Sequence, residues 1–322
     1  MTFEVIKPGL LTTLQDAGRP GYAHLGVGRS GAFDAPALRI ANALCGNLAD
    51  ACGLEFTLRG PTLHFLDDAL IAVTGAPLPI TIDGSNASMW APVPVRAGAT
   101  LELGTMRKGC RSYLAVGGGI DIPKILGSRS VDVNAALGPF DGRPLRTGDQ
   151  LPVAATKVEI GDTPSVPKWR LDPRPWFDEN AARPLRMLPG THFDNLAEAS
   201  RNELFSHTFH VAPESNRVGI RLAGPGLEWQ APIEMISEGC VPGLLQLPPS
   251  GQPIAFGPEC PVSGGYPRIG QIAAVDVPRL AQLRPGDALR FTPCTFDEAV
   301  HALHERERAL RTLETRIAAR LA

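Results

Sequence analysis

Leu70-Ile71-Ala72-Val73-Thr74, at residues 70–74, decides the fold class together with similar short runs along the chain. Most of these runs contain β-branched or aromatic residues, and Gly and Pro separate the runs, as expected of strands joined by turns. The other runs are Thr62–Phe65, Pro79–Gly84, Thr100–Leu103, Ser112–Val116, Thr208–Val211, Gly219–Leu222 and Gly243–Leu247. Their spacing predicts a mainly β protein, either a barrel or a sandwich.

One turn pattern occurs three times, at residues 95–101, 145–151 and 283–289. Each copy has an apolar residue, Arg, a spacer, Gly, two further residues and Leu. Such a segment predicts a turn that starts an outgoing strand. Coincidence can also produce so short a pattern three times, so the repeat favours two related β domains without requiring them.

Composition narrows the class of protein. The chain has 322 residues and a formal net charge of −2, and it has no basic run outside its C-terminal helix. Two domains are therefore expected, and neither nucleic acid nor a membrane is expected as a partner. Met1–Gly9 lacks a signal pattern, and the six cysteines lack CxxC spacing. We therefore expect a cytoplasmic protein with free thiols and no metal site.

The domain limits follow from a proline-rich, polar segment between Thr156 and Ala182. We expect an N-terminal β domain at 1–160, a linker at 161–182, a C-terminal β domain at 183–296 and a long helix at 297–322. Thr295–Glu298 fits a capping box at the start of this helix. Leu303, Leu310 and Ile317 recur every seven residues, which suits packing onto the parent domain or docking of a partner protein.

The first candidate site is the loop from Gln15 to Asp34, which contains five glycines among isolated polar residues. Such a loop is either solvated or the wall of a binding site. A short helix is predicted directly after it, with Asp34 as cap, Pro36 in the first turn and Gly46 as stop. A helix start facing this loop would suit a carboxylate or phosphate, and the alternative is a plain capped surface helix.

Two further candidates lie in the second half of the chain. Glu234 and Glu238 stand four residues apart among apolar and small residues, which fits either an acid–base pair or a solvated sheet edge. Ser263–Gly270 contains a Gly-Gly turn followed by Tyr and Pro, which fits either a ligand-binding loop or a hairpin turn. The sequence has no Walker A pattern and no GxSxG elbow, which argues against a P-loop and a serine hydrolase of that type.

Taken together, these motifs resemble the biotin-dependent carboxyltransferase-like family. That family includes the C subunit of bacterial 5-oxoprolinase, proteins called allophanate hydrolase subunit 2, and the carboxyltransferase domain of urea carboxylase. The likeness covers nearly the whole chain and rests on Pro8–Arg19, His24–Val27, Ser30–Asp34, Leu54-Glu55, Gly60–Leu63, Gly127–Ser130, Asn216–Leu222, Ser237–Gly239, Gln246 and Gly264–Pro267. The chain departs from the family at Pro261-Val262-Ser263 and at Gly138-Pro139.

The resemblance implies two tandem cyclophilin-like β-barrels and a component of an ATP-dependent 5-oxoprolinase. This enzyme hydrolyses 5-oxo-L-proline to L-glutamate, and the chain would act with the 5-oxoprolinase subunits A and B. ATP would be the cofactor, with its site on this chain or on a partner. The alternatives are a carboxyltransferase for urea or a related amide, supplied by biotin on a separate carrier, and a non-catalytic regulatory protein.

The resemblance and the polar clusters together give the candidate residues roles. Arg19 and the backbone of Gly26–Gly31 would hold the substrate carboxylate or carbonyl, and Glu238 or Asp16 would act as base. His24, Gln246 and Tyr266 would orient the substrate. The remaining substrate-binding candidates are Gln15, Gly26, Ser30, Gly31, Asp34, Arg129, Gly264 and Gly265.

Overall fold

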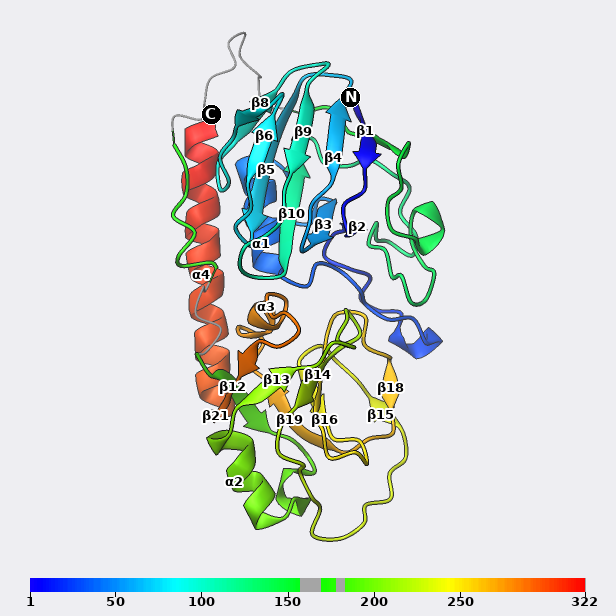
Figure 1. Cartoon of the computed structure of the whole chain (residues 1–322), viewed down its shortest axis with the longest axis vertical. Helices are drawn as coiled ribbons and strands as arrows, with labels where there is room; N and C mark the ends of the chain where they lie inside the picture. The colour runs from blue at the N-terminus through cyan, green and yellow to red at the C-terminus, as the bar shows by residue number, and fades with distance from the viewer. Residues whose placement is uncertain (157–168, 178–182, 322) are drawn as a thin grey trace. The chain divides into compact units, whose positions relative to one another are not determined.

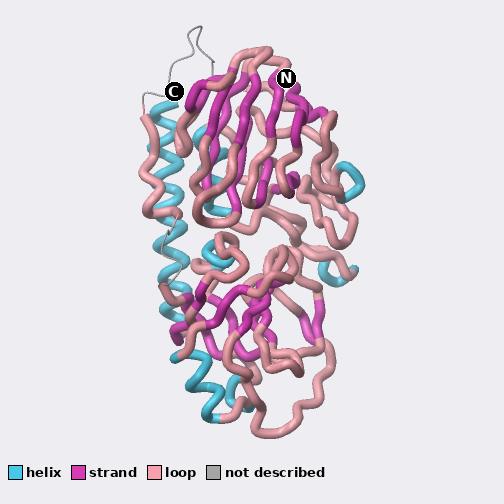
Figure 2. The backbone as a smooth tube through the Cα atoms, viewed as in Figure 1, coloured by secondary structure: helices cyan, strands magenta, loops and turns pink. Residues whose placement is uncertain are grey.

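The computed structural model describes residues 1–156, 169–177 and 183–321, so most of the linker predicted at 161–182 lies outside the described residues. The chain divides into two compact units (Figure 1). The first unit contains Met1–Arg19, Ser30–Glu179 and Ala309–Ala322, and the second contains Pro20–Arg29 and Asn180–Arg308. Strands dominate both units and are joined by long loops, as Figure 2 shows.

Two antiparallel sheets build the first unit. One has, in spatial order, β11 (Gln150–Pro152), β1 (Thr2–Lys7), β4 (Thr62–Phe65), β9 (Thr100–Leu103), β6 (Ile80–Ile82) and β7 (Ser85–Asn86). The other has β2 (Leu11–Gln15), β3 (Gly53–Thr57), β10 (Arg111–Val116), β5 (Ala69–Gly75) and β8 (Val93–Val95). Side chains of both sheets meet in one hydrophobic core, where the rings of Phe3 and Phe65 stack at 5.3 Å.

The apolar run at 70–74 forms β5, in which every residue is buried. Its neighbour β10 is buried along its whole length as well. The helix α1 (Ala35–Leu44) packs on both strands, while the core covers their other face (Figure 1). Strands covered on both faces have continuous apolar sequences, which explains why this run does not alternate.

The predicted cap of α1 is confirmed. Asp34 Oδ1 accepts a hydrogen bond of 3.2 Å from the Ala37 amide, Pro36 lies in the first turn, and the helix ends at Leu44 before Gly46. Six of its residues are buried, so one side of the helix packs into the unit. They are Ala37, Leu38, Ile40, Ala41, Asn42 and Leu44.

The second unit is built on one eight-stranded sheet. Its strands, in spatial order, are β20 (Ala288–Leu289), β13 (Phe209–Val211), β14 (Gly219–Ala223), β17 (Ile254–Phe256), β16 (Leu244–Gln246), β19 (Arg268–Ile272), β12 (Leu185–Pro189) and β21 (Phe291–Pro293). The strands β15 (Glu238–Gly239) and β18 (Ser263–Gly264) pair separately. The second unit also contains α2 (Glu198–Ser206), α3 (Val277–Leu280) and the 3-10 turns η1 (Ala23–Leu25) and η3 (Phe193–Asn195), whereas the 3-10 turn η2 (Phe140–Gly142) lies in the first unit.

The three repeated turns adopt the same conformation. Their glycines, Gly98, Gly148 and Gly286, have φ of 84°, 86° and 87°, a region that Gly enters at little cost. Each glycine amide donates to a neighbouring strand, at 2.7, 2.8 and 2.7 Å. Each turn leads into β9, β11 or β20, so the prediction of strand-starting turns is confirmed, with two copies in the first unit and one in the second.

The C-terminal helix α4 (Phe296–Leu321) contributes to both units. It begins with the predicted capping box, since Thr295 N donates to Glu298 Oε2 at 2.8 Å and Glu298 N donates to Thr295 Oγ1 at 3.3 Å. Leu310 and Ile317 are buried in the core of the first unit, whereas Leu303 is 39% exposed. Packing onto the parent unit is thus confirmed for two positions of the stripe. Among the described helices, none has both the length and the apolar character needed to cross a bilayer.

We predict that Leu310→Ala lowers the free energy of unfolding by about 3 kcal/mol, because it leaves a cavity in a core that cannot fully close. Leu303→Ala, on the same helix but half exposed, is the matched control and should cost less than about 1 kcal/mol. Urea denaturation followed by circular dichroism measures both. Equal losses in the two variants would contradict the assignment of Leu310 to the core.

Candidate functional site

The predicted site residues fall into two groups, one in each unit. The loop cluster, in the first unit, contains Gln15, Asp16, Arg19, Ser30, Ser128, Arg129, Ser130 and Asp132. The glutamate–arginine cluster, in the second unit, contains His192, Glu238, Cys240, Gln246, Gly264 and Arg268. Each cluster joins segments that are far apart in the sequence.

Asp16 organises the loop cluster. Its Oδ1 accepts hydrogen bonds from the Gly18 amide at 2.8 Å and from the hydroxyls of Ser128 and Ser130 at 2.6 Å each. Its Oδ2 accepts from the Arg129 amide at 2.6 Å. The residue is only 7% exposed. A buried carboxylate that already serves these donors fixes two loops to each other, and this geometry favours a framework role for Asp16 over that of a base.

Arg19 belongs to the same framework. Its side chain is 1% exposed, its Nη1 donates to Ser30 Oγ at 3.2 Å, and its Nη2 donates to the Ser130 carbonyl. Ser30 in turn donates to Asp132 Oδ2 at 3.1 Å. A substrate carboxylate could reach this guanidinium only by replacing protein contacts in a buried place. The expected role of Arg19 in substrate binding therefore stays a prediction, while its contacts show it holding the loop.

Gln15 and Arg129 complete the cluster. The Gln15 amide group donates to Thr13 Oγ1 at 3.0 Å and to the Val131 carbonyl at 2.9 Å, whereas its buried Oε1 has no hydrogen-bond partner among the described residues. A buried oxygen without a donor is costly, so this atom marks a place for a ligand or water donor. The Arg129 guanidinium faces Asp121 Oδ1 at 2.6 Å and the Ile122 carbonyl at 2.5 Å.

A second buried network holds the end of the loop. Glu55 Oε2 accepts from the Phe33 amide at 2.9 Å and from the Tyr113 hydroxyl at 2.8 Å. The same hydroxyl accepts from the Asp34 amide at 2.7 Å. Burial, with the negative charge of Glu55, holds the pKa of Tyr113 well above 10.0. The sequence predicts Tyr113 only as a strand residue, because nothing near it indicates a partner 58 residues away.

Gly31 allows the loop to close on itself. Its φ is +99°, and a Cβ built there would lie 3.0 Å from the Gly18 amide nitrogen and 3.1 Å from the Ala17 carbonyl carbon. Only Gly fits so close to another backbone in this conformation.

The start of α1 does not form the expected anion site. The Asp34 carboxylate occupies it, bonded to the Ala37 amide, and Asp34 is only 2% exposed. A negative charge at a helix start satisfies the free amides and repels a second anion. Asp34 is thus a cap in this structure, and its predicted role in substrate binding has no exposed group to support it.

In the second unit, Glu238 lies beside an arginine that sequence reasoning does not assign to the site. Arg268 Nη2 is 2.8 Å from Glu238 Oε2, and the two side chains are 23% and 38% exposed. In the sequence, Arg268 stands only as a member of the Ser263–Gly270 segment. Its role depends on the pairing of β15 with β18, which brings Glu238 next to Gly264, and single-sequence spacing does not reveal this pairing.

Gln246 and Cys240 lie next to this pair. Gln246 is 2% exposed, and its Nε2 is 3.7 Å from Cys240 Sγ. A Cβ at Gly264 would stand 3.0 Å from Gln246 Nε2 and 3.1 Å from Cys240 Sγ, so Gly keeps the strand close to both groups. Burial raises the pKa of Cys240, which keeps the thiol protonated near neutral pH and argues against a nucleophilic role.

The other predicted residues of the second unit lie at the surface. His24 and Gly26 are exposed in and after η1, and Gly26 has a left-handed φ of 79°. Tyr266 is 46% exposed, and Gly265 is exposed beside it. These residues are accessible to a ligand, and their predicted roles stay predictions.

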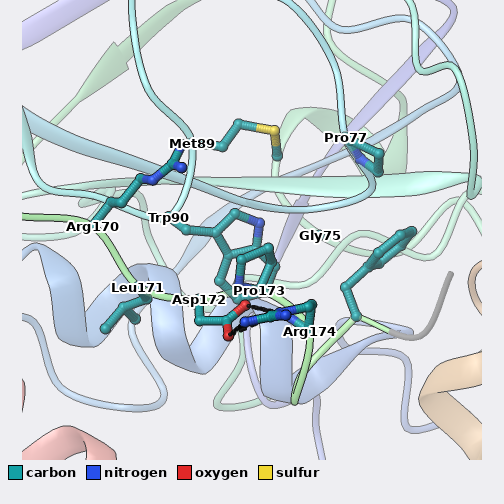
Figure 3. A pocket seen from close by; sticks show the side chains of 10 residues that line it. Gly75, Pro77, Met89, Trp90, Arg170, Leu171, Asp172, Pro173 and Arg174 are labelled. Carbon is teal, nitrogen blue, oxygen red and sulfur yellow. Dashed lines mark hydrogen bonds and ion pairs between the residues drawn. The ribbon is translucent and has the colours of Figure 1, made fainter.

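A pocket of about 600 Å³ lies elsewhere in the first unit (Figure 3). Its lining is mostly apolar and includes Met89, Trp90 and Phe177, while Arg174 at its edge is paired with Asp172 at 2.7 Å. None of the predicted site residues lines it. The candidate site therefore rests on the two polar clusters.

We predict that Asp16→Asn lowers the free energy of unfolding by about 1–3 kcal/mol, because the new amide donor would face groups that also donate. The control Asp50→Asn changes an exposed carboxylate and should stay within about 0.5 kcal/mol of the parent. Thermal or urea unfolding measures both. If Asp16→Asn were as stable as Asp50→Asn, the carboxylate would not be organising the loop.

We also predict a stability loss in alkali from Tyr113. The folded protein keeps this hydroxyl protonated after the unfolded chain has lost its proton, so stability is fully present below pH 10.0 and falls as the pH rises above that value. Urea unfolding on both sides of pH 10.0 should show a smaller fall in Tyr113→Phe than in the parent. The same fall in both proteins would mean that Tyr113 ionises freely in the folded state.

Comparison with known proteins places the chain in a family. A family model described as carboxyltransferase domain, subdomain A and B, matches residues 25–293. The 5-oxoprolinase C subunit of Escherichia coli (strain K12) is 36% identical over 314 residues, which are 98% of this chain and 98% of that protein.

Two solved structures share the fold. The Kluyveromyces lactis urea carboxylase is 28% identical with a TM-score of 0.86, covering 97% of this chain but only 29% of its own chain. The crystal structure of TTHA0988 is 36% identical with a TM-score of 0.79, covering 90% of this chain and 55% of its own chain. The mainly β prediction and the family resemblance are thereby confirmed, and the chain belongs to the carboxyltransferase domain family of subdomains A and B.

Proposed function

We propose that this chain is the C subunit of an ATP-dependent 5-oxoprolinase, which hydrolyses 5-oxo-L-proline to L-glutamate together with subunits A and B. The observation that carries the proposal is the match to the E. coli protein, in which 36% identity extends over 98% of both proteins. The K. lactis urea carboxylase matches over only 29% of its own chain, so that likeness describes one portion of a larger enzyme.

The chemistry needs hydrogen-bond donors at the lactam carbonyl and a base that removes a proton from the attacking water. Glu238 supplies the base, because its carboxylate is 38% exposed and accessible, whereas the Asp16 carboxylate is buried among donors. His24, Gln246 and Tyr266 orient the lactam. Transfer of the terminal phosphoryl group of ATP to the lactam oxygen would release ADP, and attack of water at the same carbon would then break the ring C–N bond and release phosphate, which leaves glutamate.

As part of this proposal, we assign the nucleotide site to a partner protein. The groups of this chain that were expected to meet an anion do not fit a triphosphate, because Asp34 occupies the start of α1 and Arg19 is bonded to Ser30 and Ser130. We therefore assign to this chain the binding of the lactam and the proton transfer, and no step involving ATP.

Two observations bear on the cellular compartment and on the partner proteins that we propose. The six cysteines are free thiols, as in proteins of a reducing cytoplasm. The match to TTHA0988 leaves a large part of that chain uncovered, so a relative of this chain carries further polypeptide on the same molecule.

Carboxyl transfer to a urea-like nitrogen is the second candidate, and the TM-score of 0.86 with the K. lactis urea carboxylase favours it. Biotin on a separate carrier would then deliver the carboxyl group, and the same base would deprotonate the accepting nitrogen. The two candidates differ in what the reaction consumes and releases.

The test is release of glutamate from 5-oxoproline with ATP by this chain combined with subunits A and B. We expect activity only when all three are present. Equal activity without this chain would contradict the proposal. Inactivity of the folded, associated complex would contradict it too and would favour carboxyl transfer.

Within that assay, we predict that Glu238→Gln lowers kcat at least about 10²-fold, because an amide of the same shape cannot accept the proton. Glu234→Gln is the control, since Glu234 is an exposed carboxylate four residues away. Its kcat should match that of the parent. Comparable turnover by both variants would remove Glu238 from the mechanism.

A further inference from the structure

The Arg268 guanidinium uses only part of its hydrogen-bonding capacity. Its Nη2 faces Glu238 Oε2 at 2.8 Å, while its Nε is buried and has no hydrogen-bond partner among the described residues. The Nε and an Nη of arginine together form the fork that a carboxylate bonds with both oxygens. Glu238 therefore pairs with Nη2 and leaves Nε without an acceptor among the described residues.

The backbone of Arg268 is held firmly. Its amide donates to His192 Nδ1 at 3.2 Å, and its carbonyl accepts from the His192 amide at 2.9 Å. It lies opposite the buried Gln246 at a register shift between β16 and β19. Bulges of this kind redirect side chains and are common beside active sites.

The contact with Glu238 is easily exchanged. Both side chains are partly exposed, and ion pairs in such places contribute little to stability. A ligand carboxylate that replaces Glu238 at Nη2 would also have to reach the buried Nε, where it would supply the acceptor that this atom lacks among the described residues. The displaced Glu238 would remain beside the bound ligand, where the proposed function needs a base.

We propose that Arg268 binds the carboxylate of the substrate and so determines specificity for an anionic lactam, with Glu238 as the group that the substrate displaces. This inference rests on the proposed function and adds the residue that selects the substrate. 5-Oxoproline carries one carboxylate, whereas 2-pyrrolidinone has the same ring without it and urea has none. Arg268 thus distinguishes the substrate of the first candidate function from that of the second.

The experiment measures binding of 5-oxoproline and 2-pyrrolidinone to the assembled complex by calorimetry without ATP, and KM and kcat with ATP. We expect Arg268→Met to weaken 5-oxoproline binding and to raise its KM by about 10- to 100-fold, as for loss of hydrogen bonds to a charged group. Binding of 2-pyrrolidinone should not change. Arg268→Lys should recover part of the loss, and Arg221→Met, at an exposed arginine of β14, is the control.

Glu238→Gln tests whether the substrate carboxylate displaces Glu238 from Arg268, because it removes the competing negative charge and keeps Arg268. Removing the competing carboxylate should tighten 5-oxoproline binding by up to about fivefold while kcat falls. A pair with only a structural role would instead weaken binding in both variants.

The outcomes separate the two proposals. If the parent turns over 5-oxoproline and Arg268→Met keeps the preference for the anionic lactam, the inference is wrong and the proposed function stands. If the parent binds 5-oxoproline no better than 2-pyrrolidinone, the inference is wrong whatever the turnover. If the parent shows the preference and loses it in Arg268→Met but no glutamate is released, the carboxylate site stands and the reaction assignment falls.

Discussion

The buried carboxylate of Asp16 is the constraint on which the first unit depends. The carboxylate accepts hydrogen bonds from the Gly18 and Arg129 amides and from the Ser128 and Ser130 hydroxyls. It thereby joins the loop after β2 to a segment more than a hundred residues later in the chain. Buried polar groups of this kind are costly when incomplete and specify one arrangement when complete. Further hydrogen bonds hold other parts of the loop. Arg19 donates to Ser30, Glu55 accepts from the Phe33 amide, and the Tyr113 hydroxyl accepts from the Asp34 amide.

We propose different roles for the two clusters, one as a framework and the other in the chemistry. In the loop cluster Asp16, Arg19 and Asp132 are almost wholly buried and face protein partners, which is how a scaffold is held rigid, whereas Arg129 is partly exposed. In the glutamate–arginine cluster the charged groups are partly exposed and one guanidinium donor has no partner among the described residues. Reactive groups need access to a ligand, so we place substrate binding and proton transfer at the second cluster.

Much of the fold could be predicted from local sequence. Three kinds of short pattern predict their own local structure, and each prediction is confirmed. They are the run at 70–74, the capping box at Thr295 and the three Arg-x-Gly turns. The candidate site was predictable only in part. Residue types showed that Asp16, Arg19 and Glu238 were unusual, but their roles depend on partners brought in by the sheets, such as Ser130 for Asp16 and Arg268 for Glu238. The anion site expected at α1 is not supported for a related reason, because the Asp34 side chain that caps the helix also occupies its start.

The central claim is that the partly exposed pair of Glu238 and Arg268 in the second unit, and not the buried Arg19 of the loop cluster, receives the substrate. A crystal structure of the assembled enzyme with bound 5-oxoproline tests it most directly. We predict the substrate carboxylate on Nε and an Nη of Arg268, with Glu238 displaced and Arg19 still bonded to Ser30 and Ser130. A substrate carboxylate bound by Arg19, with the pair of Glu238 and Arg268 intact, would contradict the account.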